Sequence, residues 1–291
     1  DYLTIYFTAI INISLTAYIG YLAAIPAFKD RNKKHVSLAY SMVSIVIIQI
    51  LFFLSVANII EIDSFKILLL SISLILVLIL LALRRVSMES INELLEQEKI
   101  DETFLAKSFR YNLVIFCLLL YGFVEFFFPE NSTLAYICFA CGSATFALLN
   151  DFVLKENNIL FKPFVLYIIS TISITAIGFF FLGFNYLFEL NITNHFRHFL
   201  TTGSFGMVFY VIMIIVSTIH TGRKIFTNWA LTLGLILIII ATFMRAFIPF
   251  YIEYSMTLYI LSSIIWAIPF IIYMKIFFPF LLQVRADGIK G

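Results

Sequence analysis

The sequence predicts an all-α membrane protein, a polytopic bundle of about nine transmembrane helices with its N-terminus outside and its C-terminus in the cytoplasm. Three observations predict this fold class: a strongly apolar composition, nine windows of spanning length, and an uneven distribution of basic residues among the connectors. We expect residues 1–291 to form a single transmembrane helical domain.

The composition excludes an ordinary soluble domain. Hydrophobic residues make up 62% of the 291 residues, charged residues only 12%, and the mean hydropathy is +1.04. A soluble domain carries about 25% charged residues. The net charge of +2 gives no indication of nucleic-acid binding, and the three cysteines lie in apolar stretches, so no disulfide framework is predicted. The chain enters an apolar stretch directly after Asp1 without a basic leader, so we interpret that stretch as a span and expect residues upstream of it.

A helix needs roughly 20 mostly apolar residues to cross a bilayer. Nine windows meet this requirement: residues 2–26, 37–60, 66–84, 111–128, 133–153, 163–187, 196–219, 229–250 and 256–283. Most connectors between them are short. The exception, residues 85–110, is acidic with apolar residues at mixed three- and four-residue spacing. This pattern predicts a cytoplasmic amphipathic connector helix at the membrane interface, and a solvated helical loop is the alternative.

Basic residues fix the predicted orientation. One set of alternate connectors holds most of the 19 basic residues, whereas the opposite set holds only Lys66 and Arg197. Cytoplasmic loops carry an excess of Lys and Arg, so the rich set is predicted to be cytoplasmic. That set comprises Lys29, Arg31, Lys33, Lys34, Arg84, Arg85, Lys99, Lys107, Arg110, Lys155, Lys162, Arg223, Lys224, Arg285 and Lys290.

Three of the four histidines bracket the seventh span, which makes this span the first candidate for function. Ionisable groups inside a bilayer are costly and are functional candidates by default. At 100° per residue, one helix face within about 80° of His198 holds His195, Thr202, Gly206, Met213 and His220. His198 and His220 are separated by roughly 33 Å of helix rise, so we expect an outer site at His195 and His198 and a separate inner site at His220.

Histidine and methionine together are typical ligands of haem and copper. His195 and His198, three residues apart, could both bind one copper ion but could not bind opposite faces of one haem. An outer haem would be five-coordinate or would take Met244, Met256 or a tyrosine as second ligand, and Met213 is a further sulfur candidate. The alternative is that the histidines only place polar tips in the two headgroup regions.

Arg245 is the other costly residue, since it lies inside the eighth span near the level of the outer histidines. It could pair with haem propionates or with Glu125, or it could reach the outer headgroups. Cys138 and Cys141 share a helix face, where a packing role is favoured over redox or copper chemistry.

The run from His198 to Arg223 resembles the NnrS family, whose hallmark is a segment like L-H-A-x-x-x-G-x-x-G, a later methionine, and G-H-T-G-R. Here the corresponding residues are His198, Gly203, Gly206, Met213 and His220-Thr-Gly-Arg223. Further similarities are Met-Arg-Ala-Phe at 244–247, Trp266 in the last span, Val284-Arg285-Ala-Asp287-Gly288 at the end, Gly20 to Pro26, and Phe109 to Asn112. The likeness is strong over 195–291 and patchy before that.

The resemblance implies a bacterial inner-membrane protein that contains haem and copper and is linked to nitric oxide and nitrosative stress. It implies metal ligands at His198, His195 and His220, with Arg245 and Arg223 as their charge partners.

The sequence departs from the family in several places. Nine spans fit where the family usually has twelve, so we expect a shortened member. No histidine falls near Tyr6 to Thr8, where an H-E-M motif is expected. The stretch 142–153 lacks an Arg and a Pro of the family pattern, and Ile215 and Ile219 replace the Arg and Gly before H-T-G-R.

Two further hypotheses compete with the haem or copper protein. One is a cofactor-free transporter or permease whose pathway is lined by the His/Thr/Met face, although inverted repeats with paired broken helices are not evident in the sequence. The other is a structural membrane subunit. No catalytic residue is assigned, because the sequence contains no identifiable acid–base pair, and no oligomeric state is predicted.

Overall fold

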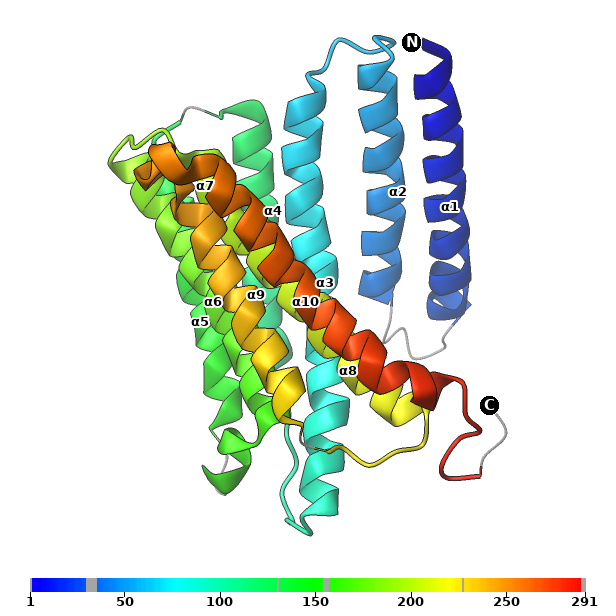
Figure 1. The fold of residues 1–291 in the computed structure, drawn as a ribbon. Coiled ribbons are helices and arrows are strands. Elements are labelled where there is room, and N and C mark those ends of the chain that lie inside the picture. The colour runs from blue at the N-terminus through cyan, green and yellow to red at the C-terminus, as the bar shows by residue number, and fades with distance from the viewer. Residues whose placement is uncertain (1, 30–35, 130, 154–156, 227, 289–291) are drawn as a thin grey trace. The chain divides into compact units, whose positions relative to one another are not determined.

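A computed structural model describes residues 2–29, 36–129, 131–153, 157–226 and 228–288, which are predominantly helical and contain no strand (Figure 1). The α-helices are α1 (Tyr2–Lys29), α2 (Val36–Val56), α3 (Ser64–Gln97), α4 (Ser108–Phe127), α5 (Thr133–Ala147), α6 (Pro163–Leu187), α7 (Thr193–Phe196), α8 (Gly206–His220), α9 (Trp229–Phe247) and α10 (Ser255–Leu281). Short 3₁₀ segments are η1 (Leu148–Phe152), η2 (Asn157–Phe161), η4 (Ile248–Phe250) and η5 (Ile252–Tyr254), and η3 (Phe199–Phe205) is a π-helix.

Within these residues, nine helical segments are long and apolar enough to cross a membrane, which confirms the predicted fold class and span count. They are Thr4–Lys29, Val36–Val56, Ser64–Gln97, Ser108–Phe127, Thr133–Phe152, Pro163–Leu187, Thr193–His220, Trp229–Phe250 and Ile252–Leu281. The orientation remains a prediction. Of the basic residues on which it rests, five lie outside the described part of the chain, namely Arg31, Lys33, Lys34, Lys155 and Lys290.

The connector predicted over residues 85–110 is not a separate interfacial helix. Helix α3 continues from the span to Gln97, because neither Pro nor Gly interrupts it. The amphipathic face lies inward, with Ser87, Ile91 and Leu95 buried. Beyond the helix, the side chain of Asn92 accepts from the Phe104 N–H at 2.7 Å and donates to the Phe104 carbonyl at 3.1 Å. These two bonds fold the non-helical stretch back against the end of α3.

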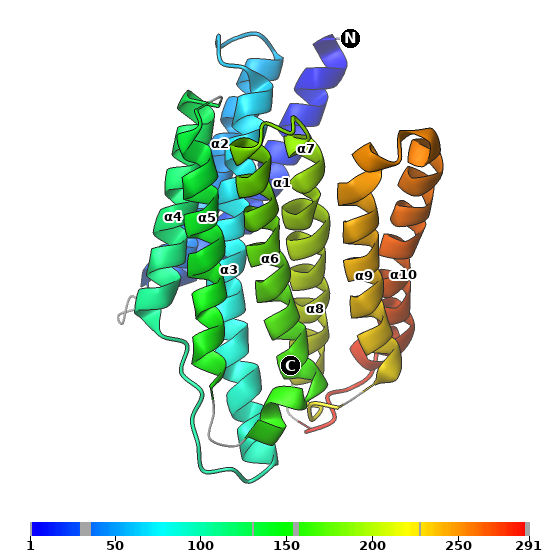
Figure 2. The same ribbon diagram turned by 90° about the vertical axis from the view of Figure 1, so that its left-hand side faces the viewer.

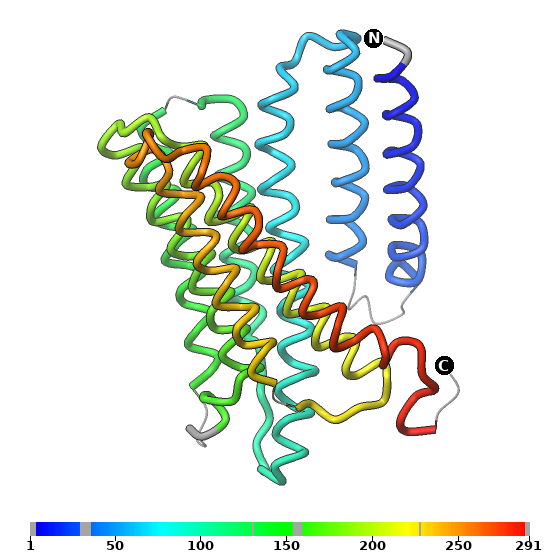
Figure 3. The backbone as a smooth tube through the Cα atoms, viewed as in Figure 1, coloured from blue at the N-terminus to red at the C-terminus, as the bar shows by residue number. Residues whose placement is uncertain are grey.

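The chain divides into two compact units, of which the first comprises residues 1–82 and 115–134. In it, α1 and α2 run side by side as an antiparallel pair (Figures 1 and 3). Small buried residues allow this contact, namely Ala24, Ala27 and Ala39. A Cβ added to Gly122 on α4 would lie 2.9 Å from the Cβ of Ser73, so glycine is required where α4 and α3 approach each other.

The second unit comprises residues 83–114 and 135–291. In it, α6 and α8 lie next to the antiparallel pair of α9 and α10 (Figure 2). Hydrogen bonds link these helices inside an otherwise apolar interior, where an unpaired polar group would be costly. They join Tyr167 to Thr232 (2.7 Å), Thr175 to Ser204 (2.7 Å), Ser217 to Tyr273 (2.6 Å) and Tyr210 to the carbonyl of Leu231 (3.1 Å).

Local sequence signals set the ends of two of these helices. Helix α6 begins at Pro163, whose missing N–H is not needed in a first helical turn. Helix α9 begins after Asn228, whose side-chain oxygen accepts from the N–H of Ala230 at 2.9 Å. This bond satisfies one of the free N–H groups of the first turn. Of the two helices, α9 carries Arg245, which lines the candidate site.

Candidate metal-binding site

The seventh span is not a uniform α-helix. It begins with α7, widens into the π-helical segment η3 directly after His198, and continues as α8. A π-turn has i→i+5 hydrogen bonds, and such turns are frequent at functional sites. The straight α-helix assumed in the sequence analysis is therefore wrong for residues 199–205. The π-helical segment changes the rotation per residue between His198 and the later part of the span. The positions of Met213 and His220 on the His198 face, which were predicted for a straight α-helix, change as well.

The π-segment is held by a residue from the last span. The indole Nε1 of Trp266 on α10 donates a hydrogen bond of 3.1 Å to the carbonyl oxygen of Thr202. A Cβ on Gly206 would lie 2.7 Å from the same indole nitrogen, so only glycine leaves room for the ring. A Cβ on Gly203 would lie 2.8 Å from both Ile174 and Thr242. Gly203 and Gly206 therefore allow the neighbouring helices to approach the π-segment closely.

His198 lies at the start of the π-segment with a fixed ring orientation. Its Nδ1 is 3.2 Å from the hydroxyl of Thr202 and 3.5 Å from that of Thr201. The Thr201 hydroxyl also donates to the carbonyl of Arg197. The hydroxyl of Thr202 is therefore the main hydrogen-bond partner of the His198 Nδ1. Both contacts use Nδ1, which leaves Nε2 for a further partner.

His195 lies one turn earlier, at the end of α7. Its ring centroid is 6.4 Å from that of His198, and the two ring planes are inclined at 68°. The Nδ1 of His195 is buried and has no hydrogen-bond partner among the described residues. Native structures rarely leave such an atom unsatisfied, so this nitrogen is available to a further partner.

A cavity of about 320 Å³ opens next to His198. Three helical segments line it with polar groups: His198, Thr201, Thr202, Arg245, Ser262, Ser263 and Trp266. His198 and Arg245, which the sequence analysis placed at one level, are thus brought to one cavity. The guanidinium carbon of Arg245 lies 4.5 Å from the ring centroid of Tyr259, a cation–π contact within the span.

Helix α10 contributes Ser262, Ser263 and Trp266 to this cavity, which was not predicted from the sequence. Ser262 and Ser263 form a polar pair inside an apolar span, and that pair was the available signal. Tyr259 gave no signal, because an aromatic residue in a span is ordinary. Within the described ranges, no group of three or more His, Cys, Asp or Glu side chains is arranged to hold a metal ion.

The comparison with protein families decides the chain's identity. The sequence model described as NnrS protein matches residues 2–285. This chain belongs to the NnrS family. Because the match covers nearly the whole sequence, the likeness extends over the part before residue 195 as well, and the expectation of a shortened member is not supported. No curated protein and no solved structure matches the chain.

In this NnrS family member, the motif His220-Thr-Gly-Arg223 forms the C-terminal cap of α8. Gly222 has a φ of +67°, a conformation that favours glycine. The N–H of Arg223 donates to the carbonyl of Thr218 at 3.1 Å, and the N–H of Gly222 donates to that of Ile219 at 3.0 Å. This is the Schellman arrangement of bonds, so the glycine of the motif has a structural explanation.

The second NnrS motif, near the end of the chain, packs on this cap. The N–H of Ala286 donates to the carbonyl of Thr221 at 3.0 Å, and Arg223 donates to the side chain of Gln283 at 2.9 Å. The guanidinium of Arg223 also lies 4.1 Å from the ring centroid of Phe280. The two sequence segments that separately resemble the family, His220 to Arg223 and Val284 to Gly288, therefore form one structure.

The remaining predicted ligands lie apart from the outer cavity. His220 is exposed in the last turn of α8, and Met213 is half-buried two turns earlier. Neither lines the cavity at His198. Cys138 and Cys141 are both fully buried, in agreement with the favoured packing role.

Proposed function

We propose that this NnrS family member binds haem, copper or both at the cavity beside His198 and His195, and that it acts in the response to nitric oxide. The observation that carries the proposal is a polar cavity inside a membrane span, lined by His198 and Arg245, with the ring of His195 beside that of His198. Ionisable groups in such a position are functional by default, and haem and copper are what the family resemblance implies.

The arrangement at His198 suits a ligand to haem iron. Metal-binding histidines usually engage their second ring nitrogen in a hydrogen bond that fixes the tautomer. When Nδ1–H donates to Thr202, the lone pair of Nε2 is available for a metal. Arg245 supplies a positive charge that suits a propionate group. With one histidine in the cavity wall, iron would keep an open position, and an iron with an open position can bind a small gas molecule.

The pair of rings also suits copper. Two imidazoles that share one ion, with metal–nitrogen bonds of about 2 Å, have ring centres roughly 5 to 6 Å apart. The observed distance of 6.4 Å between the ring centres lies just beyond this range, so both rings would have to turn towards a shared ion. The unsatisfied Nδ1 of His195 is the atom that such an ion would satisfy.

Each neighbouring residue then has a positioning role. Thr202 holds the ring of His198, Trp266 holds the carbonyl of Thr202, and Arg245 balances negative charge. The candidate for a second metal centre is His220, together with the other predicted residues Met213 and Arg223. His220 lies at the end of α8 that is far from His198, which supports a separate centre. We assign no catalytic residue.

The cellular setting belongs to the same proposal. The distribution of basic residues supports an external N-terminus and a cytoplasmic C-terminus, as in a bacterial inner-membrane protein. The immediate partners would be the lipid bilayer, a metal and nitric oxide.

One measurement tests the cofactor. The protein is expressed with ample haem and copper, purified in detergent, and examined by absorption spectroscopy and metal analysis. We expect a Soret band that shifts when nitric oxide is added, or stoichiometric copper. His198→Ala should remove the outer centre and leave any centre at His220, and His220→Ala should do the reverse. Colourless, metal-free protein would refute the proposal and leave a permease or a structural subunit.

A further inference from the structure

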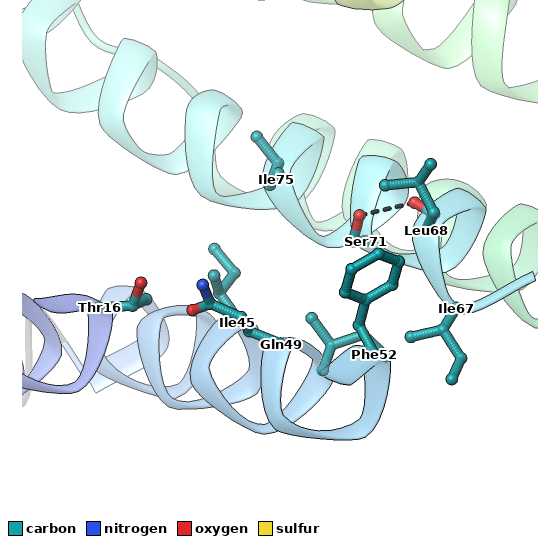
Figure 4. Close-up of a pocket in the computed structure, with 9 residues that line it drawn as sticks. Thr16, Ile45, Gln49, Phe52, Ile67, Leu68, Ser71 and Ile75 are labelled. Atoms are coloured by element: carbon teal, nitrogen blue, oxygen red, sulfur yellow. Dashed lines mark hydrogen bonds between the residues drawn. The ribbon is translucent and has the colours of Figure 1, made fainter. Parts of the chain in front are cut away.

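A second cavity, unrelated to the histidines, lies within the first unit. It has a volume of about 280 Å³ and lies between α1 and α2 on one side and the first half of α3 on the other (Figure 4). Its lining is largely apolar, with Phe52 extending from α2 towards α3. Three polar side chains interrupt this lining, namely Thr16, Gln49 and Ser71.

The polar groups in this cavity have spare capacity to accept hydrogen bonds. The Thr16 hydroxyl donates to the carbonyl of Asn12 at 2.9 Å, and the Ser71 hydroxyl donates to that of Leu68 at 2.6 Å. The Oε1 of Gln49 is buried and has no partner among the described residues. A buried acceptor that is left unpaired loses the hydrogen bond that it made with water. The cavity therefore favours a ligand that brings its own hydroxyl donor.

The depth of the cavity narrows the ligand class. Thr16 is near the middle of α1, and Gln49 and Ser71 lie several residues inside the ends of α2 and α3. A charged lipid headgroup stays at the membrane surface, whereas these acceptors lie in the apolar zone. An acyl chain reaches that depth but carries no donor. The remaining class is an apolar, membrane-soluble molecule with a hydroxyl group.

The size and shape of the cavity favour a ring. A cavity of about 150 Å³ is enough to bind benzene. The 280 Å³ space thus holds one substituted ring, and an attached tail would extend out of the cavity, which is partly open. Phe52 offers an aromatic face or edge to such a ring.

We propose that this cavity binds the ring of a membrane quinol, with a quinol hydroxyl donating to the Oε1 of Gln49. The proposal concerns binding only, and it does not depend on a metal at His198. It can therefore fail while the proposed function stands, and the reverse is equally possible.

Direct binding of a short-tailed quinol tests it. The protein in lipid nanodiscs is titrated with decylubiquinol, with decylubiquinone, and with decanol as a tail-only control. A photoreactive quinol analogue then maps the site by mass spectrometry. We expect saturable binding of the quinol, weaker binding of the quinone, none of decanol, and labelling of residues around Gln49.

Two variants sharpen the result. Gln49→Leu keeps the size of the side chain and removes the acceptor, so quinol affinity should fall at least about fivefold, the effect of one hydrogen bond. Ile75→Phe should block the cavity and abolish labelling. Gln97→Leu, outside the cavity and paired with Glu93, should bind like the parent protein. Equal affinity for quinol and quinone, labelling elsewhere, or unchanged binding by Gln49→Leu would overturn the proposal.

Discussion

The indole of Trp266 and the carbonyl oxygen of Thr202 are joined by a 3.1 Å hydrogen bond between the last span and the π-helical part of the seventh. The bond ends on the residue whose side chain holds Nδ1 of His198 at 3.2 Å. The orientation of the histidine ring is therefore coupled, through one residue, to the packing of α10. This relationship makes the outer cavity testable by substitutions that do not touch a histidine.

Replacing Trp266 by Phe keeps an aromatic ring and removes the donor. The Thr202 carbonyl then loses its partner, so we expect the free energy of unfolding to fall by about 1–2 kcal/mol. Any metal spectrum at His198 should broaden or weaken. The other tryptophan of the chain, Trp229, is 78% exposed, so Trp229→Phe is the matched control and should leave both readouts unchanged. Equal stability of the two variants would show that the bond is unimportant.

Thr202→Val removes the hydroxyl beside His198 at nearly constant volume. Outer partners of metal-binding histidines typically contribute a factor of about 10–100 to metal affinity, and we expect a loss of this size. The measurement is a competition titration with a chelator or with apo-myoglobin as haem acceptor. Thr201→Val is the control, because the Thr201 hydroxyl lies 3.5 Å from Nδ1 and already donates to a carbonyl. Indistinguishable affinities would mean that neither hydroxyl positions the ring.

Gly203→Ala introduces a Cβ only 2.8 Å from both Ile174 and Thr242. Overpacking of this kind costs about 1–3 kcal/mol, so we expect a clear fall in unfolding midpoint in detergent. Gly20→Ala is the matched control in another apolar helix, where the nearest atom would be an ordinary 3.4 Å away. There the higher helix propensity of alanine should dominate, leaving stability equal or higher. A destabilised Gly20→Ala and a neutral Gly203→Ala would contradict the packing described.

Hydropathy predicted the nine spans because a bilayer imposes a length and a composition on each crossing helix. The positions of His198 and Arg245 within their spans predicted that they lie at one level, and both line one cavity. Hydropathy could not predict the π-segment, because a local change from i→i+4 to i→i+5 hydrogen bonds does not alter the hydropathy of the sequence. The place of Ser262 in the cavity depends on how α10 packs, and one sequence does not specify which helices are neighbours. The sequence predicted a helix over residues 85–110, whereas α3 continues to Gln97 and the rest folds back on it, because this depends on the hydrogen bonds between Asn92 and Phe104.

The predicted orientation can be tested by labelling introduced cysteines in intact cells with a membrane-impermeant maleimide. The native thiols are buried, so they give a low background. Glu189→Cys lies in a connector with few basic residues and should react from outside, whereas Lys99→Cys should react only after the cells are opened. Each position serves as the control for the other, because Glu189 and Lys99 are both exposed and both have a positive φ. The reverse pattern would invert the topology.

Asp151→Asn tests the ion pair that fixes the start of α4. The carboxylate of Asp151 is 1% exposed, pairs with the 25% exposed guanidinium of Arg110, and accepts from the N–H of Lys107 at 3.0 Å. Removing one partner of a buried pair costs about 3–5 kcal/mol, and the partial exposure of Arg110 lowers our expectation to about 2–3 kcal/mol. Denaturant unfolding in detergent measures the loss.

The control for this substitution is Arg85→Gln, which breaks an i,i+4 pair with Glu89 whose side chains are 52% and 56% exposed. Exposed helix pairs contribute about 0.3–0.5 kcal/mol, so this variant should stay within about 0.5 kcal/mol of the parent protein. Losses of similar size in both variants would show that water reaches Asp151. The ion pair would then be a solvated contact, and the clamp between Arg110 and the end of η1 would contribute little to the second unit.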